Sequence, residues 1–132
     1  MYGHVYVPDL SAIKIHGKIH GGLGAGRAKA VFHTHQPYTS ILGACKRGED
    51  VLRQVHQNSC RFYDSVVYYR EFNGVVNNDE EGINLANEFK KKENRGQNKR
   101  VMMMRNHGIM TIGPTAPQAL MDLYFFEKCC RI

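Results

Sequence analysis

Residues 101–108 of this 132-residue chain read VMMMRNHG, an apolar run that is followed at once by polar residues. Four consecutive apolar residues without alternation indicate a strand that is buried on both faces of a sheet. Polar residues directly after such a strand lie at the end of the sheet, where α/β proteins commonly hold their ligands. Gly108 allows the backbone to turn tightly there. The stretch therefore predicts an α/β domain with a candidate site around His107.

The rest of the chain alternates expected strands with expected helices, which is typical of an α/β domain. The expected strands cover residues 2–7, 28–35, 65–69 and 101–104, and the expected helices cover 11–21, 38–45, 51–62, 80–89 and 116–131. Ser11 is the candidate N-cap of the first helix, and residues 21–26 (GGLGAG) are expected to form a loop. The last helix should bury a stripe of four residues, Leu120, Leu123, Tyr124 and Phe126. We thus expect a central mixed sheet flanked by helices, in a single domain over residues 1–132.

Two histidines, His33 and His35, lie two residues apart at the end of the expected strand 28–35. Side chains two apart on a strand point to the same side, so the two imidazoles come together. Such a pair either chelates a metal ion or forms hydrogen bonds within a polar surface. If this strand end neighbours the end of 101–104, His107 completes a three-histidine set with an open position, as in catalytic metal sites. Zinc is the first expectation for such a site, and iron and manganese are possible.

These motifs and their surroundings resemble the class II aldolase/adducin family. The similarity is carried by four segments, AVFHTHQPYTSIL (30–42), the run from VMMMRNHGIM to FFEKCCR (101–131), IHGKIH (15–20) and FYDSVVYYREFNGVV (62–76). The resemblance implies that His33, His35 and His107 hold one divalent metal ion. Thr34 and Asn106 are then expected to orient the imidazoles through hydrogen bonds.

The family's aldolases use the metal as a Lewis acid on a hydroxy-carbonyl substrate, and a glutamate ahead of the IHGKIH helix serves as acid and base. Here that segment, residues 8–12, reads PDLSA, and Asp9 has a shorter side chain than glutamate. The resemblance therefore implies a metal-dependent, lyase-like protein that acts on a small molecule with weakened or lost aldolase activity. The alternative is a non-catalytic, adducin-like module for the actin cytoskeleton or another protein partner.

Two tyrosines, Tyr68 and Tyr69, are further catalytic candidates, because the family's aldolases use a tyrosine from a neighbouring subunit. Packing against one face of the sheet is the alternative for both. His16 and His20 lie one helical turn apart, which is the spacing of a metal-binding pair. Without a third ligand nearby in the sequence, we expect them to serve in packing and hydrogen bonding. Family domains usually have a further N-terminal region with phosphate-binding loops, so we expect this chain to lack that region and a C-terminal tail. The resemblance also implies a homo-oligomer, a tetramer in related proteins.

The net charge of +6 is concentrated in residues 90–100, KKKENRGQNKR. Cations without interleaved aromatic residues are typical of a solvated loop, so no nucleic-acid partner is expected. The four cysteines form no C-x-x-C pair, which favours free thiols and a cytoplasmic location. The sequence contains neither the apolar core of a signal peptide near its start nor an apolar run of the ~20 residues that span a bilayer.

Overall fold

The centre of the fold is a mixed sheet of four strands in the order β1-β4-β3-β2, seen in a computed structural model that describes residues 9–46, 51–72, 74, 79–94 and 99–132. The strands are β1 (Ala30–Thr34), β2 (Val66–Tyr69), β3 (Val101–Met104) and β4 (Gly108–Gly113). Strand β3 pairs in parallel with β2, whereas the β3–β4 and β4–β1 pairs are antiparallel. The predicted fold class is therefore confirmed.

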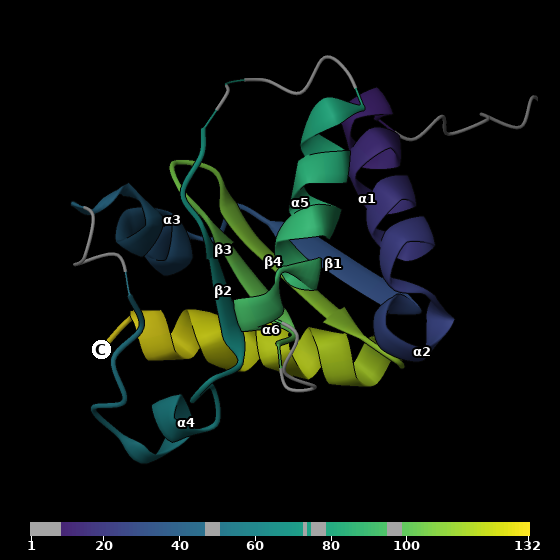
Figure 1. The fold of residues 1–132 in the computed structure, drawn as a ribbon. Helices are drawn as coiled ribbons and strands as arrows, with labels where there is room; N and C mark the ends of the chain where they lie inside the picture. Colours follow the sequence, from purple (N-terminus) through teal and green to yellow (C-terminus); the bar gives the residue numbers. More distant parts are fainter. Residues whose placement is uncertain (1–8, 47–50, 73, 75–78, 95–98) are drawn as a thin grey trace, which may run out of the picture.

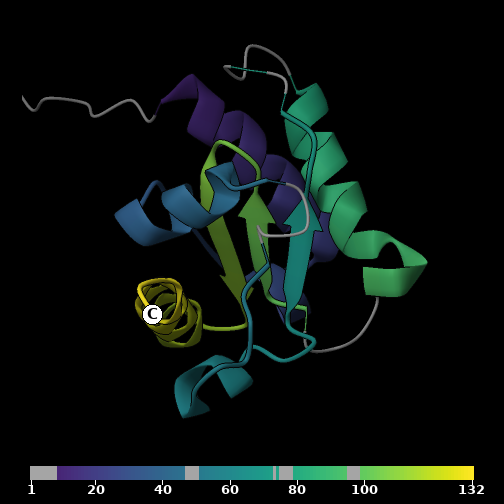
Figure 2. The ribbon, with the colours of Figure 1, turned by 90° about the vertical axis from the view of Figure 1, so that its left-hand side faces the viewer.

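Helices cover both faces of the sheet (Figure 1 and Figure 2). Helices α1 (Leu10–Leu23) and α5 (Glu80–Lys90) lie side by side on one face, and α3 (Pro37–Ala44) and α6 (Ala116–Cys130) lie on the other. Three short segments connect these elements, α2 (Ala25–Ala28), α4 (Gln57–Cys60) and the 3-10 helix η1 (Lys92–Asn94). The domain thus has three layers, with the sheet in the middle.

Alternate residues of the strands divide the core into two apolar clusters. Met102 and Met104 pack into the cluster beneath α1 and α5, whose other members include Ile15, Ile19, Leu85 and Phe89. Val101 and Met103 belong to the cluster beneath α6, with Leu123 and Phe126. Because both faces of β3 are covered, all four of its residues are buried, which explains the absence of polar alternation in VMMM.

The first helix differs from its predicted bounds at both ends. Asp9, and not Ser11, is the N-cap: its carboxylate accepts a hydrogen bond from the Ser11 backbone N–H at 2.8 Å. The helix continues to Leu23, so the predicted loop at 21–26 is wrong. Gly24 ends the helix with a φ of +75°, a left-handed conformation that glycine adopts at little cost. The expected strand at 2–7 lies outside the described residues.

Two further predictions are wrong in whole or in part, and one strand was missed. The expected helix at 51–62 is reduced to the single turn of α4, which is held by reciprocal hydrogen bonds between His56 and Ser59. Strand β4 was not predicted, although it is the strand that joins β1 to β3. In α6, Leu123 and Phe126 are buried as predicted, but Leu120 and Tyr124 are exposed.

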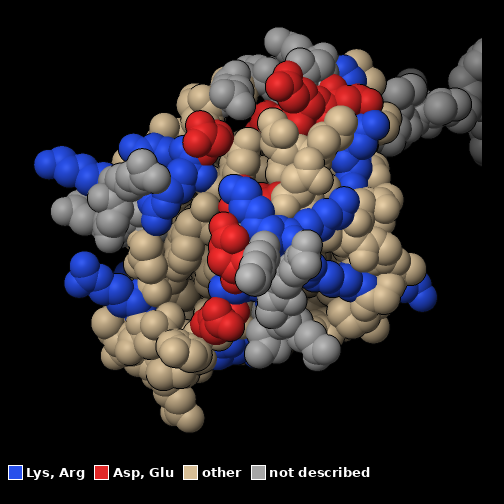
Figure 3. Space-filling view, viewed as in Figure 1, with Lys and Arg blue, Asp and Glu red and all other residues tan. Residues whose placement is uncertain are grey.

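The basic segment 90–100 is not a uniform solvated loop. Lys90 still belongs to α5, whereas Lys99 is buried and its ammonium lies 2.8 Å from the Asp64 carboxylate. Arg100 pairs with Asp122. Figure 3 shows basic and acidic side chains interspersed on one face of the molecule rather than gathered into a single basic patch. Within the described ranges, none of the helices has the length and apolar character needed to cross a membrane.

Candidate metal centre

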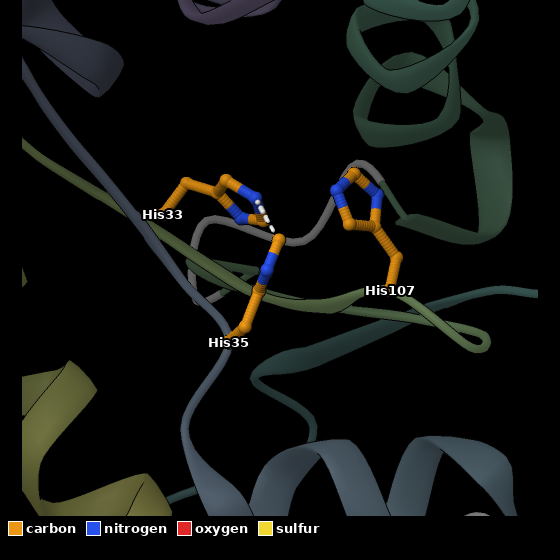
Figure 4. Close-up of side chains that lie close together, drawn as sticks. All are labelled: His33, His35 and His107. Atoms are coloured by element: carbon orange, nitrogen blue, oxygen red, sulfur yellow. Dashed lines mark hydrogen bonds between the residues drawn. The ribbon is translucent and has the colours of Figure 1, made fainter. Parts of the chain in front are cut away.

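Three imidazoles, those of His33, His35 and His107, converge at one end of the sheet (Figure 4). One nitrogen atom from each ring lies within 4.8 Å of the others. The ring centroids are 4.8–4.9 Å apart, and Nε2 of His33 lies 3.0 Å from Nε2 of His35. The structure therefore brings together the three residues that the sequence selected.

The pairing of β1 with β4 places these rings. His33 lies opposite Met110 in the β1–β4 register, and His35 follows directly after β1. His107 lies in the turn between β3 and β4, where Asn106 adopts a φ of +53°. Asparagine tolerates this left-handed conformation better than most residues, so the structure gives Asn106 a role in the turn itself.

Gly108 allows the two strand ends to approach closely. A Cβ atom at this position would collide with the backbone carbonyl oxygen of Thr34 and would lie 2.9 Å from Cδ2 of the His35 ring. Real Cβ atoms do not make such contacts, so any larger residue would displace β1 or the imidazole. The glycine of the RNHG motif thus brings His35 and His107 to the same point.

The environment of His33 keeps its imidazole neutral. The pKa of His33 is lowered to about 4, chiefly by burial. The hydrogen bond with the Ile109 carbonyl raises this pKa in part, and the nearby imidazoles of His107, His35 and His16 lower it. That hydrogen bond, from Nδ1 at 2.9 Å, fixes the tautomer and leaves Nε2 with a free lone pair. Burial also lowers the pKa of His107. Neutral imidazole is the form that binds metal ions, so the site suits a divalent cation.

The histidines line a cavity of about 680 Å³. Helix α1 contributes Ser11, Ala12, Ile15 and His16 to its wall, and the remaining lining residues are Thr34, Phe72 and Gly74. A volume of this size falls in the range of small-molecule sites. The three imidazoles therefore face a space that a small compound can enter.

Two residues near the site, His16 and Glu81, were not assigned to it from the sequence. His16 lines the cavity, whereas its neighbour His20 forms a hydrogen bond at 2.6 Å with the Ala28 carbonyl oxygen, away from the cavity wall. Glu81, in the first turn of α5, places its carboxylate Oε1 3.7 Å from Nδ1 of His107. Neither could be selected from spacing alone, because both come from helices that reach the site only through tertiary packing.

The other candidates lie as follows. The Tyr68 hydroxyl accepts a hydrogen bond from the Leu52 backbone N–H at 3.0 Å, and Tyr69 is buried in the apolar cluster beneath α1 and α5. Neither lines the cavity of its own chain, and a contribution to the site of a neighbouring subunit stays a prediction for both.

Thr34 lines the cavity, and its buried hydroxyl oxygen has no hydrogen-bond partner in the described part of the chain. Asp9 caps α1 and lies outside the cavity wall.

Comparison with known proteins supports the family resemblance that the sequence motifs indicated. The family model for the Class II Aldolase and Adducin N-terminal domain matches residues 3–132. The decarboxylase NovR of Streptomyces niveus is 27% identical over 124 residues, which cover 94% of this chain and 42% of NovR. Beta-adducin of Homo sapiens is 27% identical over 116 residues, which cover 86% of this chain and 14% of that protein.

A solved structure agrees with the fold as well. The crystal structure of an aldolase II superfamily protein from Pseudomonas syringae superimposes with a TM-score of 0.80 and 26% identity, over 97% of this chain and 46% of that one. The chain thus spans less than half the length of each of these three proteins. With the family model matched over nearly its whole length, the chain belongs to the class II aldolase and adducin N-terminal domain family.

Proposed function

We propose that this chain holds one divalent metal ion, zinc in the first instance, through His33, His35 and His107. The observation that carries the proposal is the convergence of three imidazole nitrogens within 4.8 Å of one another, beside a cavity of about 680 Å³. Three protein ligands leave a coordination position open, as in catalytic rather than structural sites. When bound, the ion supplies Lewis acidity, which polarises a carbonyl or hydroxyl oxygen.

The substrate class follows from the cavity wall. Ala12, Ile15 and Phe72 present apolar surface around a bound compound, and the Ser11 and Thr34 side chains add two hydroxyl groups. Such a wall suits a small molecule with an oxygenated end toward the histidines and few charges elsewhere. We propose a small hydroxy-carbonyl compound. Decarboxylation, the reaction in the name of the Streptomyces relative, also occurs next to a carbonyl group and is compatible with the same site.

Aldol cleavage also requires a side chain that transfers a proton. In the segment 8–12, where the family's aldolases have a glutamate, Ala12 lines the cavity and Asp9 caps α1. A positioned acid or base typically contributes a factor of about 10²–10⁴ to the rate. We therefore propose that aldol cleavage of sugar phosphates by this chain is weak or lost.

A non-catalytic, adducin-like module is the second candidate function, supported by the similarity to Beta-adducin and by the alanine at position 12. Leu120, Met121 and Tyr124 are about half exposed on α6 and offer apolar surface to a partner. A homo-oligomer would use such surface too, and we propose one, in the cytoplasm. Metal binding alone does not separate the two functions, whereas turnover of a small substrate does.

Metal analysis of the purified protein tests the proposal. We expect about one divalent ion per chain, and a large loss of bound metal in His35→Ala. His20→Ala is the matched control, because His20 is an equally exposed histidine that lies away from the cavity. Calorimetric titration with acetohydroxamate, a bidentate oxygen ligand, should give heat with the metal-loaded form and none with the metal-free form. Equal metal content in both variants and the parent chain would disprove the site.

A further inference from the structure

Glu81 is an acidic residue on the inner side of α5 that contacts the candidate metal centre from a different layer of the fold. Its side chain is 11% exposed, and its Oε1 atom lies 3.7 Å from Nδ1 of His107, whose side chain is 18% exposed. We propose that Glu81 is a positioning residue, whose carboxylate orients His107 for metal binding. This inference rests on the metal site proposed above.

The geometry of the imidazole supports this role. Figure 4 shows one ring nitrogen of His107 turned toward His33 and His35 and the other turned away from them. Because Glu81 contacts Nδ1, the nitrogen left for a metal ion is Nε2. Metal-binding histidines generally donate their second N–H to a carboxylate or a carbonyl, which fixes the tautomer and raises ligand basicity. His33 already has such an arrangement with the Ile109 carbonyl.

The carboxylate of Glu81 has no other use in the described part of the chain. Among the described residues no lysine or arginine pairs with it, and the basic side chain that it contacts is the imidazole of His107. The Glu81 side chain is only 11% exposed, and a carboxylate that lies inside the protein without a partner costs free energy. A proton donor at Nδ1 of His107 compensates for that cost. The 3.7 Å separation is longer than a normal hydrogen bond, so the two side chains must move slightly closer for the hydrogen bond to form.

Packing of α5 against α1 holds Glu81 in place. The next residue, Gly82, is buried, and a Cβ atom there would lie 2.6 Å from the Lys14 carbonyl oxygen of α1. The two helices therefore touch backbone to backbone beside Glu81. Stabilisation of the helix N-terminus is the alternative explanation for an acidic residue in the first turn. Glu80 has the same relation to the helix but is exposed, so it separates the two roles.

The test compares Glu81→Ala, Glu81→Gln and Glu80→Gln by titration of the metal-free protein with Zn²⁺. We expect Glu81→Ala to weaken binding by roughly 10–100-fold. Glu81→Gln keeps an oxygen acceptor and should restore part of that loss, and Glu80→Gln should bind like the parent chain. Thermal denaturation of the metal-free forms checks that all three fold.

A second measurement keeps the inference independent of the metal. Nitrogen-15 NMR of the metal-free parent chain should show His107 protonated at Nδ1, and Glu81→Ala should move population toward the Nε2 tautomer. Tight Zn²⁺ binding that is equal in parent and Glu81→Ala would overturn the role of Glu81 while leaving the metal site intact. If the parent chain binds no Zn²⁺, the proposed function fails. In that event an unchanged His107 tautomer in Glu81→Ala would overturn the positioning role as well.

Discussion

Nε2 of His33 lies 3.0 Å from Nε2 of His35, so the two rings can share only one hydrogen between these atoms. Because Nδ1 of His33 donates to the Ile109 carbonyl, a hydrogen on Nε2 as well would make the His33 ring a cation beside two other imidazoles. Burial already lowers the pKa of His33 to about 4. The folded site therefore resists protonation of His33, and the unfolded chain takes up that proton at a higher pH.

The stability of the metal-free protein should fall as the pH decreases from about 6.5 to about 4. The His33 pKa of about 4 is below that of an unfolded imidazole, near 6.5, so the unfolded chain binds the proton first. This contribution to the free energy of unfolding is fully present above about pH 6.5 and is lost as the pH falls toward 4. Urea denaturation at pH 7, 5.5 and 4.5 measures it, and we expect a loss of roughly 1–3 kcal/mol. His33→Gln should flatten the profile, and an equally steep profile in that variant would contradict the assignment.

Asp122→Ala should destabilise the fold strongly. Asp122 is fully buried in α6, and its two carboxylate oxygens pair with Arg61 at 3.1 Å and Arg100 at 2.8 Å. Removal of one member of a buried ion pair typically costs about 3–5 kcal/mol, and we expect the lower end of that range because the side chains of Arg61 and Arg100 are 41% and 20% exposed. Asp79→Ala is the control, since its pair with Lys18 is exposed and typically contributes about 0–1 kcal/mol. Similar urea midpoints for the two variants would show that the Asp122 pairs contribute no more to the free energy of unfolding than the exposed pair of Asp79.

Gly108→Ala should lower both metal affinity and stability, because the new methyl group would press on the Thr34 carbonyl and the His35 ring. Gly17→Ala is the control: a Cβ at Gly17 has no neighbour within 4 Å, and alanine in a helix is about 1 kcal/mol more favourable than glycine. Zn²⁺ titration and thermal denaturation report the two effects. Unchanged Zn²⁺ affinity in Gly108→Ala would mean that the site tolerates displacement of His35.

Ala12→Glu should tighten metal binding. Ala12 lines the cavity that His33, His35 and His107 share, so a longer acidic side chain there reaches toward the site from α1. A carboxylate near a cation adds electrostatic attraction and an oxygen ligand. Ala12→Gln is the uncharged control in the same Zn²⁺ titration. An increase in aldol cleavage by Ala12→Glu would further support the proposed loss of an acid/base group, and equal affinity in the two variants would argue against access from this position.

The histidine set could be predicted from the sequence because each motif is local. The H-x-H pair follows one apolar strand, and the RNHG turn follows another. The one assumption needed was that the ends of these two strands lie next to each other. Strand β4 was missed because its sequence, GIMTIG, begins and ends with glycine, which is depleted in strands. Thr111 is buried in this strand, and its hydroxyl donates a hydrogen bond to the Ala119 carbonyl oxygen at 2.9 Å. Such a tertiary contact cannot be inferred from the local sequence.

The orientation of α6 shows the same limit. A stripe through Leu120 and Tyr124 satisfies helical spacing, yet the helix buries Asp122 in place of these two residues. Burial of that carboxylate is possible only because Arg61 and Arg100 reach it from elsewhere in the chain. Glu81 likewise gains meaning only from its contact with His107. Charges that are paired across the fold cannot be placed from the spacing of apolar residues.

The pairing of β1 with β4 also sets the order of events during synthesis. The hydrogen bond between His33 and the Ile109 carbonyl joins residues that are 76 positions apart. At roughly 5–20 residues per second, a ribosome needs on the order of 4–15 s to add the missing partner strand. During that interval His33 and His35 have emerged but have no third ligand, whereas β3 and β4 pair as soon as both exist. The three histidines can therefore come together only after β4 has been synthesised, well after His33 and His35 have left the ribosome.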